Sequence, residues 1–344
     1  MSNTTETIAD LLLQTGKAHH TAFFDVDGDD PDWPLWYAEY LLQRLPPLLD
    51  RALTVSELTH LMIESDRRYR AEEPDSPWHS YYAQFIVNQY LEPGTNQSGI
   101  PLTSIDVPAL TTSQMIEVDR AMIDDYQINL TQMMENAGRN LAHLARLRFL
   151  DKDPRGKNVV VLAGSGGNGG GALAAARRLA NYGAHVLVVT TRTAESFQGV
   201  PAQQLQILQK MGVPVYQEDR LEVVDGGLQL IIDGMIGYSL RGAPLGSAAN
   251  LIRWANNQDV PILALDIPSG VDGTTGLAHD PSIAATATMT LALPKTGLLK
   301  NQLAQTVGEL YVADISVPPA LYAEPELNLK VGPIFARSDI IRLR

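Results

Sequence analysis

A glycine-rich segment between a β-branched run and an alanine-rich stretch constrains this chain most. Residues 159–182 read VVVLAGSGGNGGGALAAARRLANY, with six glycines from Gly164 to Gly171. We expect a strand, a tight loop and the start of a helix, in that order. Glycine lets the backbone approach a ligand closely, and the free N–H groups of a helix N-terminus attract an anion. The segment therefore predicts a site for a phosphorylated small molecule.

The same loop contains a GxGxxG spacing from residue 164, which matches the dinucleotide-binding fingerprint. That fingerprint expects an acidic residue after the next strand, where it holds ribose hydroxyls. The next strand candidate, 185–190, runs instead into Thr191, Arg192 and Thr193. An NAD dehydrogenase is therefore only the third of the functions that we infer, behind the two described at the end of this section. A glycine turn needed only for close helix–sheet packing stays open as an alternative.

The composition narrows the class of partner. The chain has 26 Lys and Arg against 39 Asp and Glu, a net charge of −13, which argues against nucleic acid because that affinity comes largely from cationic side chains. Cysteine is absent, so disulfides and thiolate chemistry are excluded. The N-terminal residues lack a signal-peptide pattern, and no apolar run reaches about 18 residues, the length of a membrane span. We expect a cytoplasmic protein without a membrane segment.

We expect two domains because the amino-acid composition changes along the chain. Residues 1–95 hold three of the four tryptophans and half of the tyrosines and lack a glycine-rich strand–helix junction, which indicates a small helical module of unknown role. Turn-forming residues at 92–99 have the composition of a linker. We place the boundary there, so that residues 96–344 form the second domain.

Three helices are expected within the first domain. Apolar residues at helical spacing predict one near 35–48, broken at two prolines, and another at 81–91. Between them, Thr54 and Glu57 form a capping-box pattern at a helix start.

One acidic segment of this domain raises a metal hypothesis. His19 and His20 precede Asp25-Val-Asp27-Gly28-Asp29-Asp30. A calcium loop needs glycine at its sixth position and glutamate at its twelfth, and neither is present in register. We therefore favour a solvated acidic turn.

Strand and helix patterns alternate in the second domain. Helices are expected at 112–126, 129–150, 168–182, 201–212 and 246–257, and strands at 158–163, 185–190, 213–216, 228–233, 261–265, 286–292 and 308–313. Such alternation favours right-handed crossovers and a mostly parallel sheet with helices on both faces. We expect an α/β, three-layer Rossmann-like fold preceded by a small all-α module. The methionines of 129–150 are assigned to the core.

Three strand ends carry unusual residues, at Gly164–Gly171, Asp233–Gly242 and Asp266–Gly270. Ligands of parallel sheets bind beyond the carboxyl ends of the strands, so we expect these segments to converge. Two carboxylates at such an edge can bind a cation or divide the roles of acid and base. The alternative is that each aspartate only caps the following turn.

The ordered motifs resemble the NAD(P)H-hydrate epimerase family, also called the YjeF N-terminal domain. They are GSGGNGG at 164–170, DGMIGYSLRG at 233–242, DIPSG at 266–270 and PKTG at 294–297, with TSQM at 112–115, Asp119 and MENAG at 134–138 upstream. The similarity covers about residues 105–318.

Members of that family interconvert the R and S forms of hydrated NADH and NADPH (NADHX and NADPHX), which carry a hydroxyl at C6 of the nicotinamide ring. By position, the resemblance implies substrate contacts at Gly167, Asn168, Gly169, Gly170, Gly171, Gly237, Tyr238, Ser239, Leu240, Arg241, Gly242, Ala243 and Asp266. It implies a potassium ion (K+) at Asn168, Asp233 and Ser269, whose oxygen atoms suit a hard cation.

The reaction implied by the resemblance can be argued from the bond that must break. The lone pair of the ring nitrogen can expel the C6 hydroxyl as water, which leaves a planar iminium open to water from either face. A carboxyl group such as Asp266 can protonate the leaving oxygen and then accept a proton from incoming water. Lys295 is the second catalytic candidate, either orienting substrate or tuning Asp266, with a solvated surface lysine as the alternative.

The loop departs from the family pattern, which usually reads Asn-Asn-Gly-Gly-Asp where this chain has residues 167–171 as GNGGG. Backbone donors are kept, but Gly171 lacks the aspartate side chain. A nucleotide-binding or scaffolding module without turnover is therefore the alternative function. The chain ends at Arg344, so we expect a separate hydrate dehydratase as pathway partner, and relatives suggest a homodimer.

Overall fold

The computed structural model describes residues 2–22, 30–49, 53–90, 100, 102–103, 105–218 and 227–344. The chain divides into two compact units, Met1–Asn96 and Gln97–Arg344, and each unit is described by itself. The expected linker at 92–99 lies outside the described residues. None of the helices in the described ranges is long and apolar enough to cross a membrane.

The smaller unit is helical, as the sequence predicts. Its described helices are α1 (Ser2–Ala22), α2 (Trp33–Leu41), η2 (Pro46–Leu48), α3 (Val55–Glu72) and α4 (Trp78–Tyr90). The capping box of α3 is present, because the Glu57 N–H donates to Thr54 Oγ1 (3.2 Å) and the Thr54 N–H donates to Glu57 Oε2 (2.8 Å). The helix expected at 35–48 ends earlier, at Leu41. Helix α1 was not predicted.

The segment that raised the metal hypothesis lies mostly outside the described residues, which omit 23–29. Of its flanking residues, His19 Nε2 lies 3.0 Å from Asp30 Oδ2. The part of the chain that the structure describes contains no group of three His, Cys, Asp or Glu placed to hold a metal ion.

The larger unit is built around one sheet. Its elements are α5 (Thr112–Asp124), α6 (Leu130–Arg148), β1 (Asn158–Ala163), α7 (Gly167–Asn181), β2 (His185–Thr190), η3 (Ala194–Ser196), α8 (Gly199–Lys210), β3 (Val215–Gln217), β4 (Leu228–Gly234), α9 (Gly246–Asn256), β5 (Ile262–Leu265), β6 (Ala287–Leu291), η5 (Thr296–Leu299), η6 (Asn301–Leu303), α10 (Ala304–Val307), β7 (Glu309–Ala313), α11 (Pro319–Tyr322) and β8 (Ile340–Arg342). The strand order is β3-β2-β1-β4-β5-β6-β7-β8. Along this order, every pair of adjacent strands from β3 through β7 is parallel, and the last pair, β7 with β8, is antiparallel. The predicted mostly parallel sheet is confirmed, and β8 is an edge strand that was not predicted.

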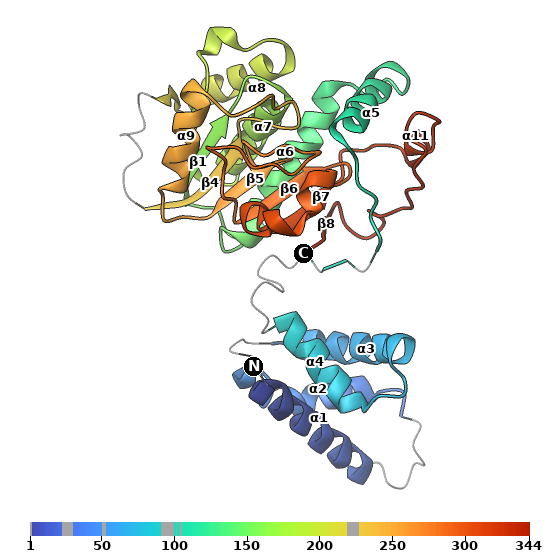
Figure 1. Ribbon diagram of the computed structural model, residues 1–344. Coiled ribbons are helices and arrows are strands. Elements are labelled where there is room, and N and C mark those ends of the chain that lie inside the picture. Colours follow the sequence, from blue (N-terminus) through green and yellow to red (C-terminus); the bar gives the residue numbers. More distant parts are fainter. Residues whose placement is uncertain are drawn as a thin grey trace. The chain divides into compact units, whose positions relative to one another are not determined.

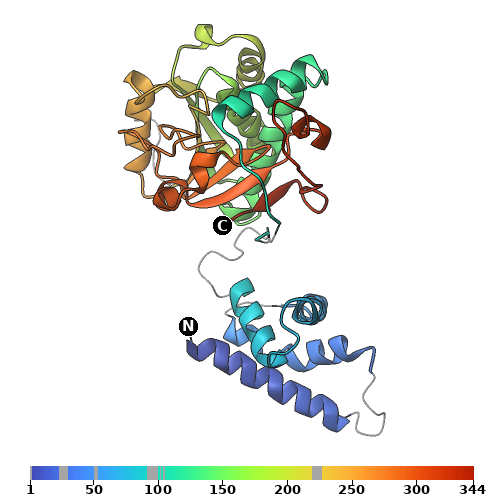
Figure 2. The same cartoon turned by 45° about the vertical axis from the view of Figure 1, so that its right-hand side comes forward.

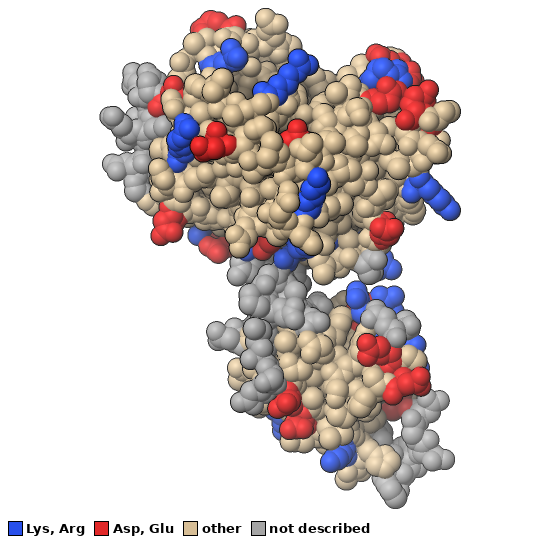
Figure 3. Space-filling view, in the orientation of Figure 1, with Lys and Arg blue, Asp and Glu red and all other residues tan. Residues whose placement is uncertain are grey.

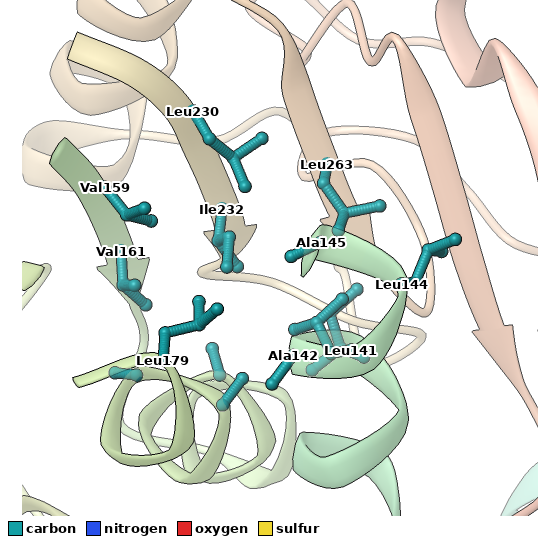
Figure 4. Packing of buried hydrophobic residues seen from close by; sticks show 14 of the residues in the cluster. Leu141, Ala142, Leu144, Ala145, Val159, Val161, Leu179, Leu230, Ile232 and Leu263 are labelled. Atoms are coloured by element: carbon teal, nitrogen blue, oxygen red, sulfur yellow. The ribbon is translucent and has the colours of Figure 1, made fainter. Parts of the chain in front are cut away.

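Helices cover both faces of this sheet (Figures 1 and 2). Successive side chains of a strand point to opposite faces. Val159 and Val161 accordingly pack in a cluster with α6, α7 and α8, whereas Val160 and Leu162 pack with α9. Figure 4 shows the first cluster, where Leu179 of α7 and side chains of α6 lie against the strands. Burial on both faces explains why these strands read as continuous apolar runs.

A third cluster joins the start of the unit to its end. Met115 and Met122 of α5 pack with Leu321, Ile334 and Ile341. In Figure 2, α5 lies beside the C-terminal segment that contains α11. The packing therefore fixes α5 next to the sheet, where it contributes one wall of the site.

Charge is dispersed on one face of the larger unit. On the face drawn in Figure 3, Lys and Arg side chains lie singly among Asp and Glu, and most of the surface is uncharged. The described residues of this face therefore form a surface of mixed sign.

Helices α6 and α7 cross at close range. A Cβ at Gly138 of α6 would lie 2.5 Å from Ala174 Cβ and 2.8 Å from the backbone nitrogen of Ala175. One turn earlier, Glu135 accepts a hydrogen bond from Arg177 of α7 at 2.5 Å. These contacts fix α7, whose N-terminus carries the glycine loop.

We expect Gly138→Ala to lower the free energy of unfolding by about 1–3 kcal/mol. The backbone of α7 cannot move aside without parting the helices, and this cost exceeds the gain in helix propensity of about 1 kcal/mol. Urea denaturation measures the change. The matched control is Gly332→Ala, where an added Cβ meets no atom within 4 Å. Equal stability of the two variants contradicts the close-contact account.

Candidate active site

The carboxyl ends of the central strands border a cavity of about 860 Å³. Its walls include the β1 loop with the start of α7 (164–168 and 171), the end of β2 (191–192), the segment after β4 (235–239), the start of α9 (245–248), Asp266, and side chains of α5 and α6. This edge is where parallel sheets bind ligands, and the volume lies in the range of small-molecule and cofactor sites. The three strand ends singled out in the sequence therefore meet at one cavity.

Glycines let three backbone segments approach one another beside this cavity. A Cβ at Gly164 would lie 2.0 Å from the carbonyl oxygen of Met235, and a Cβ at Gly169 would lie 1.7 Å from that of Gly164. Neither position accepts a side chain without moving backbone. By contrast, a Cβ at Gly166 would meet no atom within 4 Å. Close packing therefore accounts for two glycines of the fingerprint and leaves the third, Gly166, free to face a ligand.

Two helix N-termini border the cavity. Helix α7 begins at Gly167 and α9 at Gly246, and both residues are in the cavity wall. The first N–H groups of a helix lack partners within the helix, and its dipole adds positive potential there. The two ends can therefore receive the oxygens of a pyrophosphate without a cationic side chain. The part played by α9 was missed, although its place directly after the β4 segment puts its start at this edge.

Asp266 follows β5 and lies in the cavity wall. Its φ of 63° is in the left-handed region, which Asp and Asn tolerate better than most residues. The side chain is bound by Lys295, whose Nζ donates to Asp266 Oδ1 at 2.5 Å and to the carbonyl of Leu291 at 2.9 Å. Lys295 is fully buried, so the interpretation of a solvated surface lysine is wrong.

The Asp266 carboxylate is asymmetric in its contacts. Besides Lys295, Thr290 Oγ1 (3.2 Å) and the Leu291 N–H (3.3 Å) also donate to Oδ1. Every hydrogen bond that the described residues make to this carboxylate ends on Oδ1, which leaves Oδ2 available to a ligand. One oxygen is thus fixed by the protein, and the other can exchange a proton with a bound molecule.

Asp233 ends β4 and is fully buried. Its Oδ1 accepts from Ser269 Oγ (2.6 Å) and the Met235 N–H (3.1 Å), and its Oδ2 accepts from the Ser269 N–H (2.8 Å). The Met235 contact is the bond that the capping alternative expects, but the two contacts from Ser269 reach the residue from another strand end. All the partners that the described residues provide are neutral, and burial raises the pKa of Asp233 to about 6.

Asn168 lies beside the segment that follows Asp233. The Ile236 N–H donates to Ser269 Oγ at 2.9 Å, and at the next residue a Cβ on Gly237 would lie 3.3 Å from Asn168 Cβ. The Asn168 Nδ2 atom is buried and has no hydrogen-bond partner. Asn168 lines the cavity, while Asp233 and Ser269 lie buried behind it.

Only some of the expected substrate residues line the cavity. Those in the cavity wall are Gly167, Asn168, Gly171, Gly237, Tyr238, Ser239 and Asp266. Those outside the wall are Gly169 and Gly170, which are buried in packing contacts, and Leu240, Arg241, Gly242 and Ala243. The loop after β4 therefore meets the cavity through its first half.

Asp119 and Arg192 line the cavity, although the sequence analysis assigns neither of them a role in the site. Tyr238 donates a short hydrogen bond to Asp119 of α5, and burial raises the pKa of Asp119. Met133 and Met134 belong to the core, as expected, and also line the cavity. Arg192 lines it from the end of β2. The Asp119 pairing depends on the docking of α5, which sequence spacing does not reveal.

Gly171, the glycine that departs from the family pattern, lies where a side chain has little room. A Cβ at Gly171 would lie 2.9 Å from Leu265 Cδ2 and 3.6 Å from Ala137 Cβ. A side chain at this position therefore requires Leu265 to move, and Leu265 directly precedes Asp266. The nearest side chains around Gly171 are thus the apolar Leu265 and Ala137, and all three residues line the cavity.

Comparisons with known proteins agree with this architecture. Residues 130–297 match the family model of the YjeF-related protein N-terminus. An NAD(P)H-hydrate epimerase from Dehalogenimonas lykanthroporepellens is 42% identical over 70% of this chain and 94% of that protein. The bifunctional NAD(P)H-hydrate repair enzyme Nnr from Moorella thermoacetica is 34% identical over 64% of this chain, which spans 43% of that enzyme. A crystal structure of yeast YNL200c has a TM-score of 0.59 and 25% identity, covering 69% of this chain and 100% of that one.

The parallel sheet, the glycine loop and the cavity at its edge define a Rossmann-like α/β protein with a ligand site at the carboxyl ends of the strands. The match over nearly the whole length of the Dehalogenimonas protein makes the assignment more specific. This chain belongs to the NAD(P)H-hydrate epimerase family.

Burial of Asp233 predicts a pH-dependent contribution to stability. Its pKa of about 6 exceeds the ordinary value of 3.8, so the native state holds the proton more tightly than the unfolded chain. That contribution is present at low pH and is lost as the pH rises through about 6. We expect the destabilisation caused by Asp233→Asn to shrink between about pH 4 and about pH 6 and then to level off.

Urea unfolding of both proteins in potassium-free buffer measures this trend. The control is Asp106→Asn at an exposed position, for which no such trend is expected. A difference between wild type and Asp233→Asn that stays constant across this range contradicts the assignment.

Proposed function

We propose that this chain is an isomerase that interconverts the R and S forms of hydrated NADH and NADPH in the repair of damaged nicotinamide cofactors. The observation that carries the proposal is Asp266. Its Oδ1 is held by buried Lys295, and its Oδ2 is left for a ligand in a cavity of cofactor size. The printed names of the relatives, NAD(P)H-hydrate epimerase and NAD(P)H-hydrate repair enzyme, support the same reaction.

The reaction requires the hydroxyl on C6 to leave as water and water to add back from the other face of the ring. As the lone pair of the ring nitrogen forms a double bond to C6 and gives a planar iminium, the C6–O bond breaks and Asp266 delivers a proton to the leaving oxygen, which departs as water. The carboxylate then favours the transient cation by its charge. Water that adds to the other face returns its proton to Asp266, so the group is regenerated and the configuration at C6 is inverted.

Lys295 acts through Asp266 in this scheme. It lies outside the cavity wall, so it does not meet substrate and is a positioning residue. Its bonds to Leu291 O and Asp266 Oδ1 hold the carboxyl in one orientation. A fixed orientation directs Oδ2 at the reacting carbon and removes an entropic cost from the reaction.

We also propose that a potassium ion is held by oxygen atoms of Asn168, Asp233 and Ser269. Two observations fit this ion: the buried Asp233 carboxylate has only neutral partners among the described residues, and the buried Nδ2 atom of Asn168 is unpartnered. Oxygen and nitrogen of an amide are exchanged by a simple flip, which presents the oxygen to a cation. When bound, the ion supplies a positive charge beside the pyrophosphate region of the cavity.

The other parts of the hypothesis stay predictions. They are the separate hydrate dehydratase, the homodimer and the cytoplasmic location. The alternative of binding without turnover rests on Gly171. Calorimetric titration with NADP+ alongside the epimerase assay separates the two functions, since binding without conversion of the R hydrate favours the alternative.

Asp266→Asn is expected to lower kcat by at least about 100-fold, because it removes the proton-transfer group. Asparagine tolerates the left-handed backbone and still accepts a hydrogen bond from Lys295, so the fold is kept. Conversion of purified R hydrate to S hydrate, followed by chromatography against the spontaneous rate, measures the loss.

The matched control is Asp151→Asn. This exposed aspartate also has a left-handed backbone, with φ of 52°, but lies outside the cavity wall. Its turnover is expected to equal that of the wild type. Unchanged turnover in Asp266→Asn would falsify the catalytic role of Asp266.

Potassium chloride is expected to raise the Tm of the wild type above its value in choline chloride at the same ionic strength. The rise is larger near about pH 8 than near about pH 5, because protons compete with the cation for Asp233. Ser269→Ala loses most of the rise, whereas Ser113→Ala at an exposed position retains it. Equal Tm values in the two salts at both pH values contradict the ion site.

A further inference from the structure

The cavity contains one cationic side chain. Its charged residues are Asp119, Asp266 and Arg192, so Arg192 is the sole Lys or Arg among the described residues of the wall. Arg192 is exposed, and no described residue pairs with its guanidinium. In a site for an anionic cofactor, a free guanidinium is suited to bind an anionic group of the ligand, because guanidinium groups match phosphate oxygens in charge and geometry.

The place of Arg192 in the sheet indicates which end of the ligand it meets. Arg192 follows β2 and Asp266 follows β5, and the strands between them are β1 and β4. Three strand spacings separate these positions, about 14 Å. If the nicotinamide lies at Asp266, the ligand passes over the β1 and β4 loops, and its adenosine half lies over β2.

The pyrophosphate between these ends already has its own donors. The N-termini of α7 and α9 both border the middle of the cavity, beside the β1 and β4 loops. Backbone N–H groups at these ends can bind the two phosphates without a side chain. Arg192 is therefore available for a further phosphate group.

The turn after β2 is built to present this side chain. Thr190 Oγ1 donates to the carbonyl of Arg192 at 2.8 Å and lies 3.3 Å from that of Tyr216, which fixes the backbone and leaves the guanidinium free. In Rossmann-like sites, a residue after the second strand reads the adenosine ribose: a carboxylate binds the 2′-hydroxyl, and an arginine accommodates a 2′-phosphate. The nearest carboxylate along the chain, Glu195, is not in the cavity wall.

We propose that Arg192 binds the 2′-phosphate of the adenosine ribose, so that this chain prefers hydrated NADPH to hydrated NADH. The inference rests on the proposed function for the identity of the ligand. It adds a specificity-determining residue at the end of the cavity remote from Asp266.

The first test compares both hydrates as substrates of the wild type and of Arg192→Gln. We expect the wild type to favour hydrated NADPH in kcat/KM by about tenfold or more, the effect of a hydrogen-bonded charged pair. Arg192→Gln lowers kcat/KM for hydrated NADPH to near the value for hydrated NADH and leaves the latter within about twofold. Arg253→Gln, an exposed arginine of α9 outside the cavity wall, is the matched control and changes neither.

The second test needs no turnover. Calorimetry measures Kd for NADP+ and for NAD+ with the same three proteins, and the preference for NADP+ is expected in the wild type and Arg253→Gln and is lost in Arg192→Gln. If the proteins show this pattern of preference for NADP+ but no epimerisation is detected, the role of Arg192 stands and the proposed function is refuted. Equal weakening of both nucleotides places Arg192 on the pyrophosphate and overturns the proposal, as does a wild type that binds both equally.

Discussion

Backbone contact between the β1 loop, α7 and the segment after β4 is the constraint on which the site depends. Gly164 and Gly169 lie where a Cβ would collide with carbonyl oxygens, so only glycine brings these three segments so close. This contact places the N-terminus of α7 beside the turn that leads to α9. Packing therefore brings together the two helix N-termini that we propose as the anion site, before any substrate-binding side chain is considered.

The two buried carboxylates at this edge have partners of different charge. Asp266 is matched by the ammonium group of Lys295, whereas Asp233 receives only neutral donors from the described residues. A buried charge without a counter-charge is costly, and its pKa shifts to reduce that cost. The first arrangement suits a group that must exchange protons at one free oxygen, and the second suits a ligand for a cation.

The sequence predicted what depends on local patterns. The bounds of β1 and β2 agree with the expected 158–163 and 185–190, because β-branched runs stop at glycine or polar residues. The convergence of the three strand ends followed from parallel topology. Helix α1 buries Ile8 and Leu12, an i, i+4 pair that the sequence analysis did not use, whereas the three residues of β8 are too short a run to show a period. Burial of Lys295 was beyond sequence, since lysine is usually exposed and its partner lies 29 residues away.

A crystal structure of the protein with NADP+ tests the central claim most directly. The account predicts the pyrophosphate on the N–H groups that begin α7 and the nicotinamide ring beside Asp266 Oδ2. A nucleotide bound outside this cavity, or one whose nicotinamide lies away from Asp266, contradicts it.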